Sequence, residues 1–338
     1  MVEMPRCDIC SARDAVVYQA HTGLRLCKAC FFSNVIARVS KEIFRYSMIK
    51  HSDRILIGVS GGKDSFVLLD ILSQIHDPSR LGGVTVIEGI EGYNRAEHIA
   101  EIKRMAAERG VELHVVSIKE LWGASVDEMV RMSIEKRQKI SPCTYCGIHR
   151  RKSLNLIARE LGYSKVATAH NLDDEIQTIV INILRGDIAR LYMNHPLRPK
   201  GSGLFIDKIK PLRKIYEWET AKYAYLAGYK PQEVECPYLE LFPSLRARVR
   251  DMIYRIEASK PGSMLRLLEW FDNTFNPSKQ NNRETPKLGL CSICGEPTSP
   301  NRSICKSCEL QIKSLGEVKI ARNVFENTTV GMRYSRTS

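Results

Sequence analysis

Apolar positions along this chain follow two patterns that alternate with each other. Residues 55–59 form a short continuous apolar run rich in β-branched side chains, which is typical of a strand buried on both faces. Similar runs occupy residues 84–87, 111–116 and 165–168. Elsewhere apolar residues recur three and four positions apart, as in amphipathic helices. The predicted helices cover residues 34–44, 66–72, 96–109 and 172–184, and then 217–226, 245–259 and 264–271. Strands that alternate with helices pair in parallel through right-handed crossovers, so the pattern predicts an α/β fold with a doubly wound parallel sheet.

The composition is typical of a folded protein without a membrane span. The chain has 338 residues, of which 43% are hydrophobic. No run of about 18 apolar residues suggests a transmembrane helix, and residues 1–10 lack the apolar region of a signal peptide. We therefore expect a soluble cytoplasmic protein that has no membrane partner.

The charge of the chain is strongly positive. Lys and Arg number 51 against 38 acidic residues, a net charge of +13. Such an excess favours a polyanionic partner, because each neutralised phosphate releases a counterion. Charge alone is equally compatible with a basic protein that has no such partner. A membrane surface is disfavoured, since the sequence contains no long basic amphipathic helix.

A glycine-containing loop follows the first apolar run. Its sequence is Ser60-Gly61-Gly62-Lys63-Asp64-Ser65, and a helix is predicted directly after it. Backbone N–H groups and a helix N-terminus at such a place bind phosphate, and glycines allow the close approach. The loop is neither a Walker A motif nor a dinucleotide fingerprint. It resembles the pyrophosphate loop of N-type ATP pyrophosphatases, which cleave ATP between the α and β phosphates; the alternative is a glycine turn that only caps a helix.

A second acidic motif follows the fourth apolar run. Asp173 and Asp174 occur in His170-Asn-Leu-Asp-Asp-Glu175, at the start of a predicted helix. Carboxylates at the carboxyl end of a parallel strand suit Mg²⁺ that neutralises phosphate charge. Acids that only complement the helix dipole are the alternative. Because the carboxyl ends of the strands meet at one edge of the sheet, we expect these carboxylates to face the loop.

Eight of the eleven cysteines form two quartets of paired Cys-x-x-Cys motifs, one near each end of the chain. The quartets are Cys7, Cys10, Cys27 and Cys30, and Cys291, Cys294, Cys305 and Cys308. Four thiolates at this spacing bind tetrahedral Zn²⁺, and closed sites of this kind stabilise domains too small to fold on a core. The sequence therefore predicts two structural Zn²⁺ ions, with rubredoxin-like iron as an alternative. A zinc ribbon can also contact nucleic acid.

The other three cysteines are Cys143, Cys146 and Cys236. Three thiolates can hold a [4Fe–4S] cluster and leave one iron without a protein ligand. Redox chemistry of the Cys143 and Cys146 pair, or a persulfide on one thiol, is an alternative. Two buried cysteines with an unrelated third is another. The basic run at residues 150–152 argues against burial of the pair.

The order of the motifs resembles one family over nearly the whole chain, from Cys7 to Cys308. It runs from the first quartet through the loop, Pro142-Cys-Thr-Tyr-Cys-Gly147, His170-Asn-Leu-Asp-Asp-Glu175 and Glu235-Cys-Pro-Tyr238 to the second quartet. This combination is similar to the tRNA 2-thiouridine synthetases of the TtuA/TtcA superfamily. Cys146-Gly-Ile-His-Arg150-Arg151 is similar to the branch that thiolates the wobble uridine in archaea and the eukaryotic cytoplasm. The branch that acts on the T-loop uridine usually has Lys where Arg150 stands.

The resemblance implies an N-type ATP pyrophosphatase fold, of the adenine nucleotide alpha hydrolase-like class, flanked by zinc-binding modules. The expected domains are an N-terminal zinc knuckle at 1–32, a catalytic domain with a helical C-terminal part at 33–275, a linker at 276–287, a C-terminal zinc ribbon at 288–312 and a tail at 313–338.

The resemblance also implies a two-step reaction. ATP adenylates the C2 oxygen of a tRNA uridine, and sulfur then replaces that oxygen. The implied catalytic residues are Lys63, Asp64, Arg150, Asp174, Cys143 and Cys236, and the three lone cysteines would hold the cluster. The implied ATP-binding residues are Gly58, Ser60, Gly61, Gly62, Lys63, Asp64, Ser65, Ala169, Asp173 and Asp174. Lys63 and Arg150 would stabilise charge on the α-phosphate, and Asp173 or Asp174 would act through Mg²⁺.

The implied partners are tRNA and a ubiquitin-like sulfur-carrier protein with a C-terminal thiocarboxylate. A homodimer or a paralogous partner subunit is compatible with the resemblance. Three alternatives stay open at the level of sequence: the same chemistry at the T-loop uridine, an ATP pyrophosphatase that acts on a small molecule, and a non-catalytic zinc-ribbon protein that binds RNA.

Overall fold

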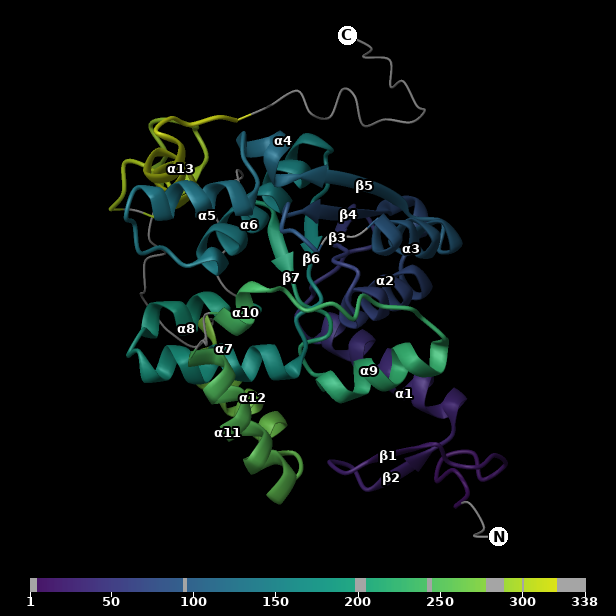
Figure 1. The fold of residues 1–338 in the computed structure, drawn as a ribbon. Coiled ribbons are helices and arrows are strands. Elements are labelled where there is room, and N and C mark those ends of the chain that lie inside the picture. The colour runs from purple at the N-terminus through teal and green to yellow at the C-terminus, as the bar shows by residue number, and fades with distance from the viewer. Residues whose placement is uncertain are drawn as a thin grey trace.

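A parallel sheet of five strands forms the centre of the structure, which is a computed structural model (Figure 1). The structure describes residues 5–93, 96–197, 205–241, 245–277, 289–299 and 301–320. Most of the predicted linker at 276–287 and the end of the predicted tail at 313–338 lie outside these residues. In spatial order the strands are β5 (Glu112–Ser117), β4 (Leu81–Ile87), β3 (Ile55–Gly58), β6 (Lys165–Ala167) and β7 (Asp207–Ile209). The predicted doubly wound parallel sheet is confirmed, although the short edge strand β7 was not foreseen.

Helices cover both faces of this sheet, because the central strand buries side chains on both sides. Ile55 and Ile57 pack in one core cluster and Leu56 in another, as the alternation along a strand requires. The first cluster includes α1 (Lys28–Arg45), α2 (Lys63–Ile75), α3 (Ala96–Glu108) and α9 (Glu217–Ala227). The second includes α4 (Ile118–Trp122), α5 (Val126–Glu135), α6 (Pro142–Glu160) and one residue of α13 (Lys306–Leu315).

A third core cluster holds a helical part beside the sheet. It contains residues of α7 (Leu172–Leu184), α8 (Ile188–Asn194), α11 (Leu245–Ser259) and α12 (Ser263–Thr274). The remaining short helices are η1 (Pro78–Arg80) and α10 (Tyr238–Leu241). No helix in the described part of the chain is long and apolar enough to cross a membrane.

The two cysteine modules lie at opposite ends of the molecule (Figure 1). The first is built on the antiparallel hairpin of β1 (Val17–Gln19) and β2 (Leu24–Leu26) and runs into α1. The second combines the hairpin of β8 (Gly289–Leu290) and β9 (Pro297–Thr298) with α13, which packs on α5 and α6. The sheet and its helices therefore separate the two predicted metal sites.

Candidate active site

The predicted phosphate loop connects β3 to α2 in the geometry that anion binding requires. Gly61 has a φ of 84°, in the left-handed region where a side chain is strained. A Cβ at this position would also lie 3.1 Å from Cδ1 of Ile102. Gly62 is the N-cap of α2, and its carbonyl accepts a hydrogen bond of 2.7 Å from the Ser65 hydroxyl. The loop thus presents the N-terminus of α2, with its partial positive charge, at the carboxyl end of the central strand.

A cleft of about 550 Å³ opens over this loop. The cleft lies at the carboxyl end of β3, between its neighbours β4 and β6. The chain connections leave this point in opposite directions, and ligands of doubly wound sheets usually bind at such a point. The predicted ATP-binding residues that line it are Gly58, Ser60, Gly62, Asp64, Ser65, Ala169 and Asp174. Its volume is suited to a small organic ligand such as a nucleotide.

Two carboxylates face each other in the cleft. Oδ1 of Asp64 accepts hydrogen bonds from the Asn171 amide at 3.1 Å and from the Thr220 hydroxyl at 2.5 Å. Asp174 caps α7 together with Asn171 and lies 3.5 Å from Arg246. Burial raises the pKa of Asp174, and the negative charge of Asp64 raises it further. A pair of carboxylates that repel each other in this way is a suitable site for a divalent cation.

Two of the predicted site residues point away from the cleft. Lys63 Nζ forms ion pairs of 3.0 Å with Asp64 and with Glu217 of α9. Asp173 accepts a hydrogen bond of 2.7 Å from the backbone N–H of Glu217, and burial raises its pKa to about 6. Both side chains line a different cavity, of about 560 Å³, with Trp218. The structure therefore brings Asp174, and not Asp173, to the phosphate loop.

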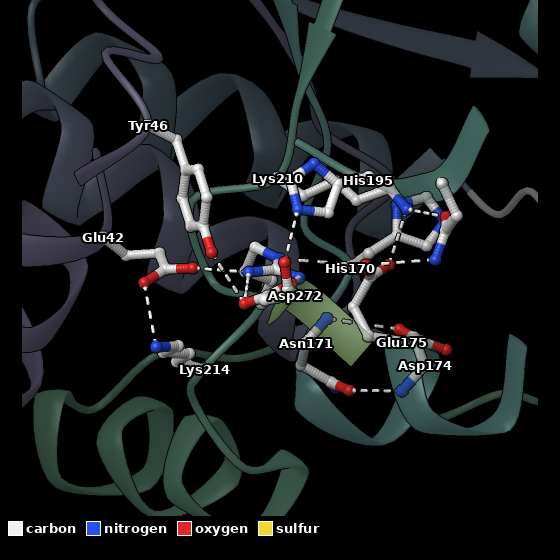
Figure 2. Close-up of polar contacts among 12 residues, drawn as sticks. Glu42, Tyr46, His170, Asn171, Asp174, Glu175, His195, Lys210, Lys214 and Asp272 are labelled. Carbon is white, nitrogen blue, oxygen red and sulfur yellow. Dashed lines mark hydrogen bonds and ion pairs between the residues drawn. The ribbon is translucent and has the colours of Figure 1, made fainter. Parts of the chain in front are cut away.

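The third acid of the motif, Glu175, is buried in an ion-pair network behind the cleft (Figure 2). The Glu175 carboxylate accepts a hydrogen bond of 2.6 Å from Lys210 Nζ. Burial raises the pKa of Glu175, but the positive charges of Lys210 and Arg213 outweigh this effect and lower the pKa overall. Arg213, 1% exposed, also pairs at 2.6 Å with Glu42 and with Asp272. Because unpaired buried charges are costly, this network fixes the start of α7 and with it the position of Asp174.

The Cys143 and Cys146 motif forms the first turns of α6. Cys143 is exposed and Cys146 is half-buried. Cys236 approaches them on the segment 228–237, which we call the strap. The backbone N–H of Gln232 in the strap donates a hydrogen bond of 2.8 Å to the Gly61 carbonyl. The strap therefore connects the phosphate loop directly to the third cysteine.

The three lone cysteines are close enough to affect one another's ionisation. Burial raises the pKa of the Cys146 thiol to about 11, and Cys236 and Cys143 add to the rise. Their sulfur atoms are nevertheless more widely spaced than those of a single-ion site. Among the described residues, only the two terminal quartets have sulfur atoms that all lie within 4.8 Å of one another. These three cysteines therefore do not form a compact site for a single metal ion.

Arg150 lies between the cysteines and the cleft. Its Nη1 is 3.5 Å from the Glu88 carboxylate, and it lines the same cleft as the phosphate loop. Burial would lower the pKa of Arg150, but the neighbouring Cys146 and Glu88 raise it overall. The guanidinium thus stays charged at the point where the cleft meets the cysteines.

Both terminal quartets have the spacing of a closed tetrahedral site. Cys10 and Cys27 Sγ are 3.9 Å apart, and Cys294 and Cys305 Sγ are 3.7 Å apart. A tetrahedron with Zn–S bonds of about 2.3 Å has edges of about 3.8 Å. The four sulfur atoms of each group therefore fit a single ion of this size.

Several cleft residues were not predicted from the sequence. Thr85, Glu88 and Arg246 line the cleft. Gln232 donates a hydrogen bond to Gly61 of the loop, and Thr220 donates one to Asp64. Glu88 could have been found because it directly follows β4, at the same sheet edge as the loop. Gln232, Thr220 and Arg246 come from the helical C-terminal part, where no motif or periodicity marks them.

Comparisons with known proteins give consistent matches. Residues 33–254 match the PP-loop domain family, and residues 6–32 match the N-terminal LIM domain of the 2-thiouridine synthetase TtuA. The chain is 32% identical over 313 residues to cytoplasmic tRNA 2-thiolation protein 1 of Saccharomyces cerevisiae, covering 90% of this chain and 85% of that protein. It is 35% identical over 318 residues to a probable sulfurtransferase of Methanocaldococcus jannaschii, covering 92% and 89%.

One solved structure is similar over most of its length. It is the U34-tRNA thiolase NcsA from Methanococcus maripaludis with its [4Fe–4S] cluster. The TM-score is 0.75 at 30% sequence identity, and the match covers 92% of this chain and 96% of that one.

Proposed function

Because the chain belongs to the PP-loop family that includes the tRNA 2-thiolation proteins, we propose that it is an ATP-dependent tRNA uridine 2-sulfurtransferase acting at the wobble uridine. This membership confirms the resemblance drawn from the motifs. The observation that carries the proposal is one cleft that is lined by the phosphate loop, the carboxylates of Asp64 and Asp174, and Arg150. The guanidinium of Arg150 is close enough to Cys146 to lower the pKa of that thiol, so the cleft and the lone cysteines are neighbours. The names of the relatives support cytoplasmic tRNA as the substrate and the cytoplasm as the location.

In the first step, the loop and the N-terminus of α2 bind the β- and γ-phosphates of ATP. Asp64 and Asp174 would hold a Mg²⁺ ion, which would offset the negative charge of these phosphates. The uridine C2 oxygen forms a bond to the α-phosphorus as the bond to the bridging oxygen breaks, and pyrophosphate leaves. Arg150, charged and at the end of the cleft nearest the cysteines, stabilises the negative charge that develops on the α-phosphate.

In the second step, sulfur attacks C2 and AMP leaves with the former C2 oxygen. Cys143, Cys146 and Cys236 would hold a [4Fe–4S] cluster, because three thiolates leave one of its irons without a protein ligand. Their sulfur atoms do not form a compact single-ion site, which is compatible with this role. When bound, the cluster supplies an iron that holds the sulfur to be transferred. The strap places Cys236 for this role, and Glu88 and Arg150 set the charge around the cysteines.

The terminal quartets hold one structural Zn²⁺ each in this proposal, since their sulfur spacing fits the tetrahedral ion. A ubiquitin-like protein with a C-terminal thiocarboxylate delivers the sulfur. Arg150, where the T-loop branch usually has Lys, favours the wobble uridine as the target.

A reconstituted assay tests the proposed roles. Purified protein is incubated anaerobically with ATP, a sulfur donor and tRNA that has a wobble uridine, and 2-thiouridine is measured by mass spectrometry of the nucleosides. Asp64→Asn and Asp174→Asn should each lower the rate by about 100-fold or more, because a preorganised charge is lost. Asp173→Asn is the matched control and should change the rate little. The side-chain oxygen of the asparagine can still accept the hydrogen bond from the backbone N–H of Glu217.

Three outcomes would contradict the proposal. Unchanged 2-thiouridine in tRNA from cells lacking the gene would reject the activity, and loss only at the T-loop position would move the target. About two zinc ions per chain without iron or sulfide, after anaerobic purification, would reject the cluster and favour a persulfide on one thiol.

A further inference from the structure

The helix that presents Cys143 and Cys146 also reaches the C-terminal quartet. Lys152 of α6 places Nζ 3.3 Å from Cys294 Sγ and 3.4 Å from Cys305 Sγ, within hydrogen-bonding range of both. The same atom is 4.0 Å from Cys308 Sγ. On its other side it lies 4.8 Å from the ring centroid of Trp122. One ammonium group therefore donates to the sulfur atoms of a predicted metal site from outside the module that contains them.

The charge of the quartet makes this contact important. Four thiolates and one divalent ion carry a net charge of −2, and all four cysteines of this site are buried. A buried anion is costly unless a counter-charge and hydrogen bonds compensate it. Lys152 donates to two of these sulfur atoms. Its own position is fixed by the neighbouring Trp122, which is fully buried and donates a hydrogen bond of 2.8 Å to Ser153 of α6.

The sulfur atoms of the module and its main apolar contact with the domain belong to different core clusters. Its four cysteines form a core cluster of their own, with only partly buried neighbours. Leu310 of α13 packs in the cluster that contains Tyr145 of α6, which lies between Cys143 and Cys146. Cys146 and Lys152 are separated by about 9 Å along the helix axis. Loss of the metal would therefore remove both a counter-ion and an apolar neighbour from the helix that bears the two cysteines.

We propose that Lys152 is a positioning residue that couples the C-terminal metal site to the cysteine-bearing first turns of α6. With the metal bound, the thiolates accept charge-assisted hydrogen bonds from Lys152, and α13 stays against α6. Without the metal, or without the ammonium, the first turns of α6 lose this support. The proposal rests on the proposed function only in naming the cluster as what Cys143 and Cys146 hold.

Hydrogen exchange measured by mass spectrometry tests the coupling in the full chain, zinc-loaded and free of iron. Lys152→Met should raise exchange over residues 142–150 by about tenfold, because local opening there becomes easier. Lys152→Arg keeps the positive charge, so its exchange over residues 142–150 should stay near that of the parent. The matched control is Arg159→Gln, which removes an ion pair of 2.5 Å between the same helix and Glu296 of the module, away from the sulfur atoms.

A second measurement reads the sulfur contact itself. With Co²⁺ in place of Zn²⁺, the sulfur-to-cobalt charge-transfer bands should shift in Lys152→Met and should not shift in Arg159→Gln. Unchanged bands and unchanged exchange in Lys152→Met would overturn the proposal, as would an equal effect of Arg159→Gln on residues 142–150. If Lys152→Met does not fold, Lys152→Gln takes its place. Parental exchange over residues 142–150 and unshifted cobalt bands in Lys152→Gln would then overturn the proposal equally. Neither measurement uses tRNA, ATP or a cluster, so failure to thiolate tRNA would leave this result standing.

Discussion

The two cysteine modules differ in how they join the core of the protein. Around the N-terminal quartet, Val17, Leu26 and Phe31 pack in the same core cluster as the central strand β3. The buried residues around the C-terminal quartet are its own four cysteines, which form a separate cluster. Gln19 of the first module is fully buried and donates a hydrogen bond of 2.7 Å to Glu219 of α9. The second module is held by Leu310 of α13, which packs in the other core cluster, and by charged contacts of Lys152 with sulfur and of Arg159 with Glu296. The same pairs of cysteines thus serve a module that is part of the main core and one whose sulfur atoms lie outside the larger core clusters and have a charged neighbour.

The largest expected effect comes from removing one metal at a time. Cys308→Ser should abolish the C-terminal site and leave residues 289–320 open to proteolysis, because binding of structural zinc contributes about 10–16 kcal/mol to domains that lack a core. Cys10→Ser should release zinc from the first module while the hairpin stays protected by its packing. Zinc content and limited proteolysis measure both. Equal protease sensitivity of the two modules after metal loss would remove the distinction drawn between them.

A smaller effect is expected from a core substitution in the first module. Leu26→Ala should lower the free energy of unfolding of the whole catalytic domain by about 2–5 kcal/mol, because Leu26 is fully buried in the main core. Chemical denaturation followed by fluorescence measures this change. Ile293→Ala in the second module is the control, since that side chain is 45% exposed, and should stay within about 0.5 kcal/mol. A local effect of Leu26→Ala, confined to the hairpin, would show that the module is independent of the domain.

The smallest effect is a pH dependence at the first module. Burial lowers the pKa of His21, whose ring lies 4.7 Å from that of Tyr216. Between this lowered value and the ordinary 6.5, the unfolded chain binds more protons than the folded one, so stability falls as the pH drops below 6.5. His21→Phe should flatten that part of a stability profile measured from pH 7.5 to 5.5. The same slope in both proteins would place the titration elsewhere.

The parts of the fold that follow from local pattern were predictable. The apolar run at residues 55–59 predicts a strand, and the glycines that follow it predict a tight loop, because glycine tolerates such backbone conformations. The helix predicted at 172–184 matches α7. The strand β7 was missed because it has only three residues, two of them charged. A strand this short at a sheet edge is defined by its pairing with β6, which is not visible in its own sequence.

The directions of adjacent side chains were not predictable. Successive helix residues point about 100° apart, so neighbours in one motif face different surroundings. Asp173 faces α9 while Asp174 faces the cleft, and which one does so depends on how α7 is rotated by the buried network around Arg213. The basic run at residues 150–152 is a second example. Arg150 lies beside Glu88, whereas Lys152 contacts the sulfur atoms of the C-terminal quartet.

The strap determines when the sulfur site can exist during protein synthesis. Cys236 follows Cys146 by ninety residues, so it leaves the ribosome about 5–18 s later at about 5–20 residues per second. Until then the third cysteine of the proposed site is missing, and so is Gln232, which donates a hydrogen bond to Gly61 of the phosphate loop from the same segment. If the three cysteines hold a cluster as proposed, its insertion has to wait until translation has passed the strap.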